Sequence, residues 1–558
     1  MSAARAFLTP LLRAPLTSYI AILLLQLKVV WGMWWYKDLT AGDDSNYFLR
    51  AWNWFESGRS SFAWSPLYTY LYGLLFRFSS DAYVLSIAQR LIIDFVLAVL
   101  VLALMRHLLP AGVAWMAAAW WVVLPVDFNS LYEVHLFAVI PLLLGVLCAL
   151  WKPGPWGRGM ATACFLIAGV LMRQEYLPAM LCMAAVGIGW DAVQSASGKL
   201  RVRTLAGAYG LPLVAAFVMI GVFFEHSFPL DVALEMRAKN AMNTCQLYAF
   251  DYQQRAADLP GNPWTSCKPL MNRVFGSSDV TVPQALLRNP RAMLEHVAWN
   301  IREMPAGLQI ALFNVRWGGA NPDYRESPIS PLIWIPSLAL MALLIYGLPL
   351  GIRGANLIPL TSEGVTWGWV ALLCASGGAM TAILMANARP ATLFILAIGV
   401  RAAVGLAVCG VIRRWPRMML PGSAAAILLV GAALLLPRVY QPGPSPRPLM
   451  QAYRRLTPFR DLFRGPNVSL VATESDVVQF AGYCRCPSVR FDELRAGMKP
   501  GEALGDALNR RGATIFLTDE RTIGDGALRD FLANPGAYRW QKIAGGVSGD
   551  WALFHTAR

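Results

Sequence analysis

The chain has 558 residues, of which 56% are hydrophobic and only 15% are charged, and its mean hydropathy is +0.45. An average soluble domain carries roughly 25% charged residues, so this composition and its repeated apolar runs of about 20 residues exclude a soluble globular protein and indicate a chain solvated by lipid. The net charge of +15 does not indicate a nucleic-acid partner, because lysine and arginine gather at the ends of the apolar runs, where membrane proteins use them to set orientation.

Eleven apolar segments are predicted to be membrane spans: 17–36, 82–105, 111–127, 134–151, 159–172, 177–194, 204–224, 330–350, 365–386, 390–411 and 418–437. The first is too long, and lacks the small-residue cleavage site, for a removed signal peptide. Arg5 and Arg13 place the N-terminus in the cytoplasm. Alternation of the spans then puts every short basic loop on the same side: Arg106, Lys152 with Arg158, Lys199 to Arg203, Arg353 and the cluster at Arg413.

The same alternation leaves four stretches outside the cytoplasm: 37–81, 128–133, 225–329 and everything after 437. The last begins with a stiff proline-rich segment at 441–448. It then reads as a small α/β domain with buried strands at 468–472 and 514–518, a helix at 501–511 and a closing hairpin of 540–543 with 551–555. We therefore predict a transmembrane domain at 1–437 and an extracytoplasmic α/β domain at 438–558.

Two cysteine pairs lie outside the predicted spans. Cys245 and Cys267 share the large external loop, where an oxidising compartment permits a disulfide, although sequence alone does not show that their Cα atoms approach closely enough. Cys484 and Cys486 are two residues apart in the terminal domain, and two ligands do not make a zinc site.

An acidic pair follows the first span, in Gly42-Asp43-Asp44-Ser45-Asn46-Tyr47-Phe48. Two adjacent carboxylates at the edge of a bilayer raise each other's pKa, so holding them there has a cost. A solvated loop or a helix cap at Asp44 or Ser45 is the simplest explanation. However, residues 47–57 form an amphipathic, aromatic-rich pattern typical of an interfacial helix, and a second apolar segment that begins at Trp64 is too short to span reliably.

This arrangement resembles the GT-C superfamily of polyprenyl-phosphate-sugar-dependent glycosyltransferases, which includes protein O-mannosyltransferases, lipid A aminoarabinose transferases and mycobacterial arabinofuranosyltransferases. Asp43-Asp44 matches the family's acidic pair and Tyr47 its nearby aromatic residue. Ser65-Pro66-Leu67 matches the end of a later Lys-Pro-Pro-Leu type motif, but Trp64 stands where that motif has lysine. This departure puts an aminoarabinose specificity in doubt. The resemblance covers the whole chain in layout and about 30 residues in motif.

The resemblance implies an inverting transfer of sugar from a polyprenyl-phosphate donor to a glycan, lipid or protein acceptor on the outer face of a bacterial inner or plasma membrane. It implies that Asp43 is the catalytic base, with Asp44 tuning its pKa or orienting the acceptor. Tyr47 is assigned with the donor-binding residues. Which sugar and which acceptor are used, and whether a divalent metal ion takes part, the sequence leaves open.

A cation should meet the departing phosphate. Arg389, near the outer start of a late span, is the favoured residue by resemblance, and Arg173 is the second choice; an interfacial anchor is an alternative for Arg389. Glu133, His135 and Glu175 lie at the outer ends of other spans and are candidates for binding substrate. A capped helix start explains Glu133 and His135 equally well.

Two other functions fit a polytopic chain. A transporter or flippase of a lipid-linked substrate would more often show inverted repeats or paired broken spans, and no such pairing is apparent here. A scaffold protein would leave the acidic pair without a purpose. The sequence therefore favours the glycosyltransferase.

Overall fold

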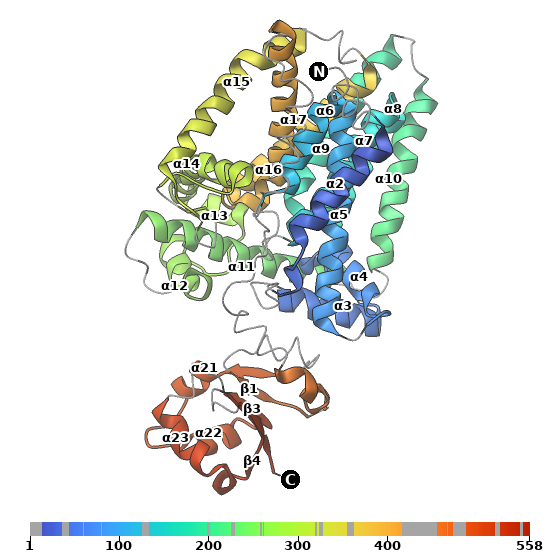
Figure 1. Cartoon of the computed structure of the whole chain (residues 1–558). Coiled ribbons are helices and arrows are strands. Elements are labelled where there is room, and N and C mark those ends of the chain that lie inside the picture. The colour runs from blue at the N-terminus through green and yellow to red at the C-terminus, as the bar shows by residue number, and fades with distance from the viewer. Residues whose placement is uncertain are drawn as a thin grey trace, which may run out of the picture. The chain divides into compact units, whose positions relative to one another are not determined.

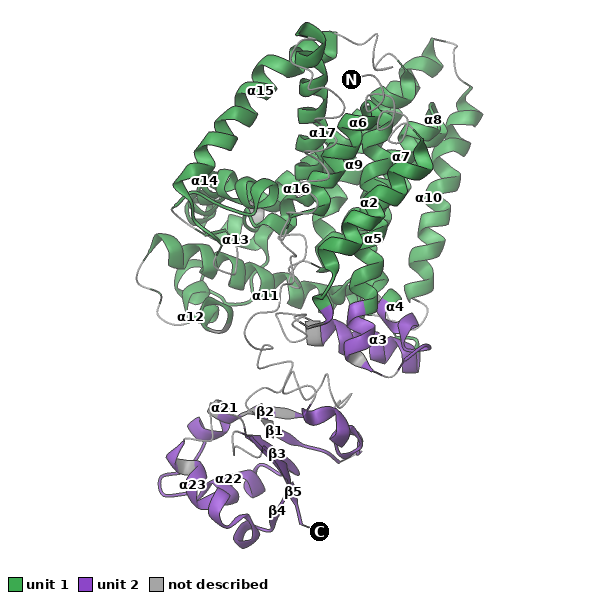
Figure 2. Cartoon of the chain, viewed as in Figure 1, with its two compact units in different colours: residues 1–33, 58–71, 88–441 green, residues 34–57, 72–87, 442–558 purple. Residues whose placement is uncertain are grey.

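The computed structural model describes residues 14–35, 44–59, 61–79, 81–124, 133–197, 201–224, 229–256, 259, 262–318, 321–322, 327–353, 362–415, 455–465, 467–472, 487–518, 525–546 and 551–557. The chain forms two compact units (Figure 2). Unit 1 comprises residues 1–33, 58–71 and 88–441, and unit 2 comprises residues 34–57, 72–87 and 442–558.

Unit 1 is built from helices (Figure 1). Ten of the eleven predicted spans are helical: α2 (Pro15–Val30), α5 (Ala82–Leu108), α6 (Ala111–Val122), α7 (Glu133–Trp151), α8 (Pro155–Leu171), α9 (Leu177–Ala196), α10 (Val202–Phe224), α15 (Trp334–Arg353), α16 (Glu363–Met385) and α17 (Pro390–Arg414). The eleventh, 418–437, lies outside the described residues. Among the described residues, seven helices are long and apolar enough to cross a membrane: α5, α7, α9, α10, α15, α16 and α17. The predicted polytopic helical fold is confirmed.

Prolines mark where many of these helices begin. Pro155 and Pro390 are the first residues of α8 and α17. Proline suits the first helical position because its missing N–H would have no intrahelical partner there. Proline also drives the preceding residue out of the helical region, and Arg389 accordingly has an extended backbone, with φ −65° and ψ 151°. Residues 386–389 therefore form a turn between α16 and α17.

Small residues bring some helices into backbone contact. A Cβ on Gly159 of α8 would lie 2.0 Å from the carbonyl oxygen of Ala208 in α10, and one on Gly410 of α17 would lie 2.4 Å from that of Gly347 in α15. Close approach of this kind is typical of helices in lipid, where packing rather than water exclusion drives association.

Arg158 differs from the prediction. The sequence placed it in a short basic loop before a span that begins at 159, but Arg158 lies in the first turn of α8 and is 2% exposed. Its Nε donates to Asp191 of α9 at 3.0 Å and its Nη1 to Glu363 of α16 at 2.8 Å, while the Tyr209 hydroxyl donates to Asp191 at 2.9 Å. Because an unpaired buried charge is costly, these partners explain how the arginine is accommodated among four helices.

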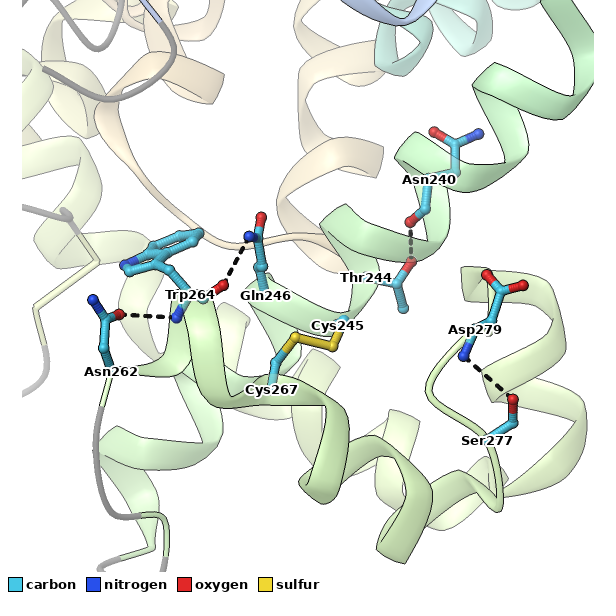
Figure 3. The surroundings of a disulfide bond; sticks show 9 residues. All are labelled: Asn240, Thr244, Cys245, Gln246, Asn262, Trp264, Cys267, Ser277 and Asp279. Carbon is cyan, nitrogen blue, oxygen red and sulfur yellow. Dashed lines mark hydrogen bonds between the residues drawn. A yellow bond between two sulfur atoms is a disulfide. The ribbon is translucent and has the colours of Figure 1, made fainter. Parts of the chain in front are cut away.

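The predicted external loop 225–329 contains four helices that the sequence analysis did not assign: α11 (Pro229–Arg255), α12 (Pro263–Phe275), α13 (Val282–Arg288) and α14 (Pro290–Phe313). Cys245 of α11 and Cys267 of α12 form a disulfide with their Cα atoms 5.5 Å apart (Figure 3). Nearby, the side-chain amide of Gln246 donates to the carbonyl oxygen of Trp264 at 3.0 Å. Both cysteines belong to a buried apolar cluster with Tyr248 and Met271.

The C-terminal part of unit 2 is a small α/β fold. Its five-stranded sheet has the order β2-β1-β3-β5-β4, in which the first three strands are parallel and β5 is antiparallel to both β3 and β4. The strands are β1 (Leu470–Ala472), β2 (Ser488–Arg490), β3 (Ile515–Thr518), β4 (Trp540–Gly545) and β5 (Ala552–Thr556), and the helices are α21 (Phe491–Ala496), α22 (Leu504–Arg510) and α23 (Gly526–Ala533).

This fold agrees with the predicted strands, helix and hairpin. Buried rings of Phe516, Phe531 and Phe554 form the centre of its core. The short strand β2 was not predicted, and Cys484 and Cys486 lie outside the described residues.

Candidate functional site

Asp44, the second residue of the acidic pair, is the first residue of α3 (Asp44–Ser57), and Asp43 is outside the described residues. Tyr47 is a buried residue of the same helix. The amphipathic helix predicted at 47–57 is therefore present as α3.

Aromatic side chains join α3 to the end of α4 (Pro66–Leu75) within unit 2. The rings of Phe48 and Tyr72 are 5.7 Å apart, and those of Trp52 and Phe76 are 5.0 Å apart, both in edge-to-face contact. A Cβ on Gly73 would lie 2.4 Å from the indole of Trp54, so the glycine allows the close approach. The two short helices predicted after the acidic pair thus pack against each other.

In unit 1, residues from separate segments meet beside the first turn of α7. His135 is 2% exposed, and Nη2 of Arg389, in the α16–α17 turn, lies 2.8 Å from its Nε2. Because arginine only donates hydrogen bonds, the Nε2 atom of His135 is the acceptor in this contact. These two residues are 254 positions apart, so the fold brings together two of the predicted site residues.

Two more predicted site residues complete this group. Nε of Arg173 donates to Glu175 at 2.9 Å, and the same carboxylate oxygen lies 3.8 Å from Nδ1 of His135. Arg173 follows the end of α8 and has an extended backbone. Glu175 lies in the 3-10 helix η5 (Gln174–Tyr176), which leads into α9. We call Arg173, Glu175, His135 and Arg389 the arginine–histidine cluster.

Glu133, also in the first turn of α7, has a partner that the sequence analysis missed. Nη1 of Arg90 in α5 lies 3.8 Å from Glu133, and its Nε donates to Asp94 at 3.2 Å. All three side chains are buried. The signal was present in the sequence, since Arg90 and Asp94 stand four residues apart within an apolar span, where ionisable groups are functional candidates by default.

The segment that matches the later family motif lies against the arginine–histidine cluster. The Ser65 hydroxyl donates to the carbonyl oxygen of Met172, the residue before Arg173, at 2.8 Å. Ser65 is 3% exposed and has φ +51°, an uncommon value for a residue other than glycine. This contact sets Trp64-Ser65-Pro66 beside the extended backbone that carries Arg173.

A cation from α11 lies over Trp64, the residue that stands in place of the motif's lysine. Nζ of Lys239 is 3.7 Å from the centre of the Trp64 ring, within the range of a cation–π interaction. The neighbouring Asn240 donates to Gln174 of η5 at 3.1 Å. The sequence analysis did not select Lys239, because a lone lysine in a polar helix carries no motif.

In the described part of the chain, which does not include Asp43, no group of three or more His, Cys, Asp or Glu side chains could hold a metal ion.

No protein-family model matches the sequence, and no curated protein matches it. Among solved structures, ArnT from Cupriavidus metallidurans resembles the chain in its apo state, with 13% identity, 96% of each chain covered and a TM-score of 0.35. Its crystal structure bound to undecaprenyl phosphate gives 11% identity, 96% of this chain and 97% of ArnT covered, and a TM-score of 0.34.

Proposed function

We propose that the protein is a membrane glycosyltransferase of the GT-C type, which moves a sugar from a polyprenyl-phosphate donor to a glycan, lipid or protein acceptor on the extracytoplasmic face. The observation that carries this proposal is the arginine–histidine cluster. Four residues selected from the sequence as outer-end candidates, on three separate segments, are neighbours in the fold. Such convergence is what recognition of a charged substrate requires and what a set of unrelated surface anchors would not produce.

The transfer is a single displacement at the anomeric carbon of the sugar. The acceptor hydroxyl oxygen forms a bond to that carbon while the bond to the phosphate oxygen breaks, so the configuration inverts. The electron pair of the broken bond leaves on the polyprenyl phosphate, and the hydroxyl proton passes to a carboxylate. Asp43 is the proposed base, and Asp44 is proposed to orient the acceptor or to keep the pKa of Asp43 suited to the task.

The departing phosphate gains charge, and cations stabilise it. Arg389 is the proposed main contact, because its planar guanidinium can donate two hydrogen bonds to a phosphate while a neutral His135 fixes its direction. Arg173 and Lys239 are the proposed additional cations. Glu175 is proposed to hold Arg173 in place through their 2.9 Å hydrogen bond. Tyr47, beside the acidic pair in sequence, remains the proposed aromatic contact to the donor.

Glu133 is proposed to bind the acceptor or the sugar through its carboxylate. The pair formed by Arg90 and Asp94 lies beside it and fixes its environment. A carboxylate suits this role because sugars present hydroxyl donors.

Binding of undecaprenyl phosphate to purified protein tests the phosphate contact. Arg389→Ala should weaken binding by roughly 10- to 100-fold, the worth of one or two hydrogen bonds from a charged donor. Arg413→Ala is the matched control, since it removes the same side chain from an exposed position at the other end of α17. Equal affinities for both variants and the unaltered protein would remove Arg389 from the phosphate site.

A further inference from the structure

We propose that Gly307 and Asn300 of α14 are positioning residues for Arg389, so that a helix of the external segment sets where the guanidinium meets its ligand. This inference rests on the proposed function, in which Arg389 contacts the donor phosphate. It assigns a role to α14, which carries none of the residues selected from the sequence.

Gly307 lies where α14 faces the backbone of the turn that carries Arg389. A Cβ at position 307 would lie 1.9 Å from the carbonyl oxygen of Ala388 and 2.9 Å from Leu393 Cδ1. Real Cβ atoms do not approach a backbone oxygen so closely, so any larger residue must displace the Ala388 peptide. That peptide joins directly to Arg389, and its displacement moves the arginine.

Asn300 holds the same turn by a hydrogen bond. It is fully buried, and its Nδ2 donates to the carbonyl oxygen of Ala386 at 3.3 Å. The ring of His296, one helical turn earlier, lies 3.4 Å from that amide nitrogen, and its other nitrogen lies 3.4 Å from a carboxylate oxygen of Asp251 in α11. The turn is thus connected through α14 to α11, the helix that carries Cys245.

The turn is also fixed from the side of α17. The Thr392 hydroxyl donates to the carbonyl oxygen of Arg389 at 2.8 Å, and Pro390 fixes the start of the helix. α14 packs against both α16 and α17 (Figure 1). α14 meets the turn at two peptides, those of Ala386 and Ala388, which lie between the packed helices α16 and α17.

The test compares Gly307→Ala with Gly377→Ala, an equivalent change on α16 where a new Cβ meets nothing within 4 Å. We expect Gly307→Ala to weaken undecaprenyl phosphate binding by about 10- to 100-fold, the loss of one or two hydrogen bonds from the displaced guanidinium, and Gly377→Ala to leave it unchanged. In an Arg389→Ala background, Gly307→Ala should cause no further loss, because its effect passes through the arginine. Wild-type affinity in Gly307→Ala, or an equal loss in both backgrounds, would overturn the proposal.

If Gly307→Ala does not fold, a second pair of variants tests whether α14 positions Arg389. Asn300→Asp removes the amide donor to Ala386 and keeps the shape, and Gln309→Glu makes the same change on α14 at a residue that contacts Ser337 and Trp317 instead. Only Asn300→Asp should weaken binding, and equal affinities would count against the role of α14.

The proposed function can fail separately. If Arg389→Ala itself binds undecaprenyl phosphate normally, the phosphate contact is wrong, and a cryo-EM structure of Gly307→Ala then tests positioning directly. An Arg389–His135 contact that remains at the 2.8 Å of the unaltered protein would overturn positioning, and a displaced arginine would support it.

Discussion

Two buried acids, Glu303 of α14 and Asp251 of α11, illustrate how burial changes protonation. Glu303 of α14 is 2% exposed, and burial raises its pKa to about 7, although the charges of Arg255 and Arg316 oppose the shift. Burial also raises the pKa of Asp251 well above its usual value, and the negative charge of Glu303 adds to that effect. In both carboxyls, folding therefore shifts the equilibrium toward the protonated form.

Glu303 should make stability depend on pH. Its folded pKa of about 7 lies above the ordinary value of 4.5, so the folded state holds the proton more tightly than the unfolded state, and stability falls as pH rises between these values. In Glu303→Gln the side chain stays neutral at every pH, so stability should decrease less between pH 4.5 and about 7 than in the unaltered protein. The melting temperature measured across this interval tests the idea, with Glu295→Gln, an exposed position on the same helix, as the control. An unchanged pH profile in Glu303→Gln would show that its carboxyl does not titrate there.

At the scale of helices and strands, length and apolarity decided what could be predicted. Long apolar runs such as α7 and α17 were assigned from sequence, because a helix surrounded by lipid or other helices is apolar all round. Helices α11 to α14 were not assigned from sequence, because their many polar residues are typical of a loop. Strand β2 was not assigned either, because its three residues are too few to show the alternation of a strand. The burial of Arg158 was not predicted, because its partners, Asp191 and Glu363, come from distant parts of the chain.

The disulfide between Cys245 and Cys267 links α11 to α12. Its two cysteines are 22 residues apart, and closing a loop of that size should stabilise the protein by roughly 3 kcal/mol in the chain-entropy model. We expect Cys245→Ser to lower the unfolding free energy by about that amount, and Cys182→Ser, at an exposed free thiol in α9, to have little effect. Non-reducing peptide mapping checks the link itself. Alkylation of both Cys245 and Cys267 without a reductant would contradict it.

For the whole molecule, the orientation in the membrane is a prediction from the distribution of basic residues. The proposed phosphate site depends on this predicted orientation, because the proposed reaction takes place outside the cytoplasm and needs Arg389 at the outer end of α17. The alternation of the spans predicts which residues lie at that end. It could not predict that Arg389 would contact His135, because that pairing depends on how helices far apart in the chain pack.

Reporter fusions test the orientation. A reporter attached after Arg558 should be active only outside the cytoplasm, and one inserted near Lys199 only inside, because translocating basic loops is unfavourable. Expression of each fusion, measured by immunoblot, controls for loss of the protein. A cytoplasmic C-terminus would place the arginine–histidine cluster on the wrong side for the proposed reaction.

The most direct test of the glycosyltransferase assignment is the turnover of purified Asp43→Asn with a synthetic polyprenyl-phosphate sugar. Asparagine keeps the shape of aspartate but cannot accept a proton, so we expect turnover to fall by about 100-fold or more while donor binding and thermal stability are retained. Asp44→Asn should cost less. Asparagine caps a helix about as well as aspartate, so a purely structural role would leave turnover near normal, and that result would contradict the assignment.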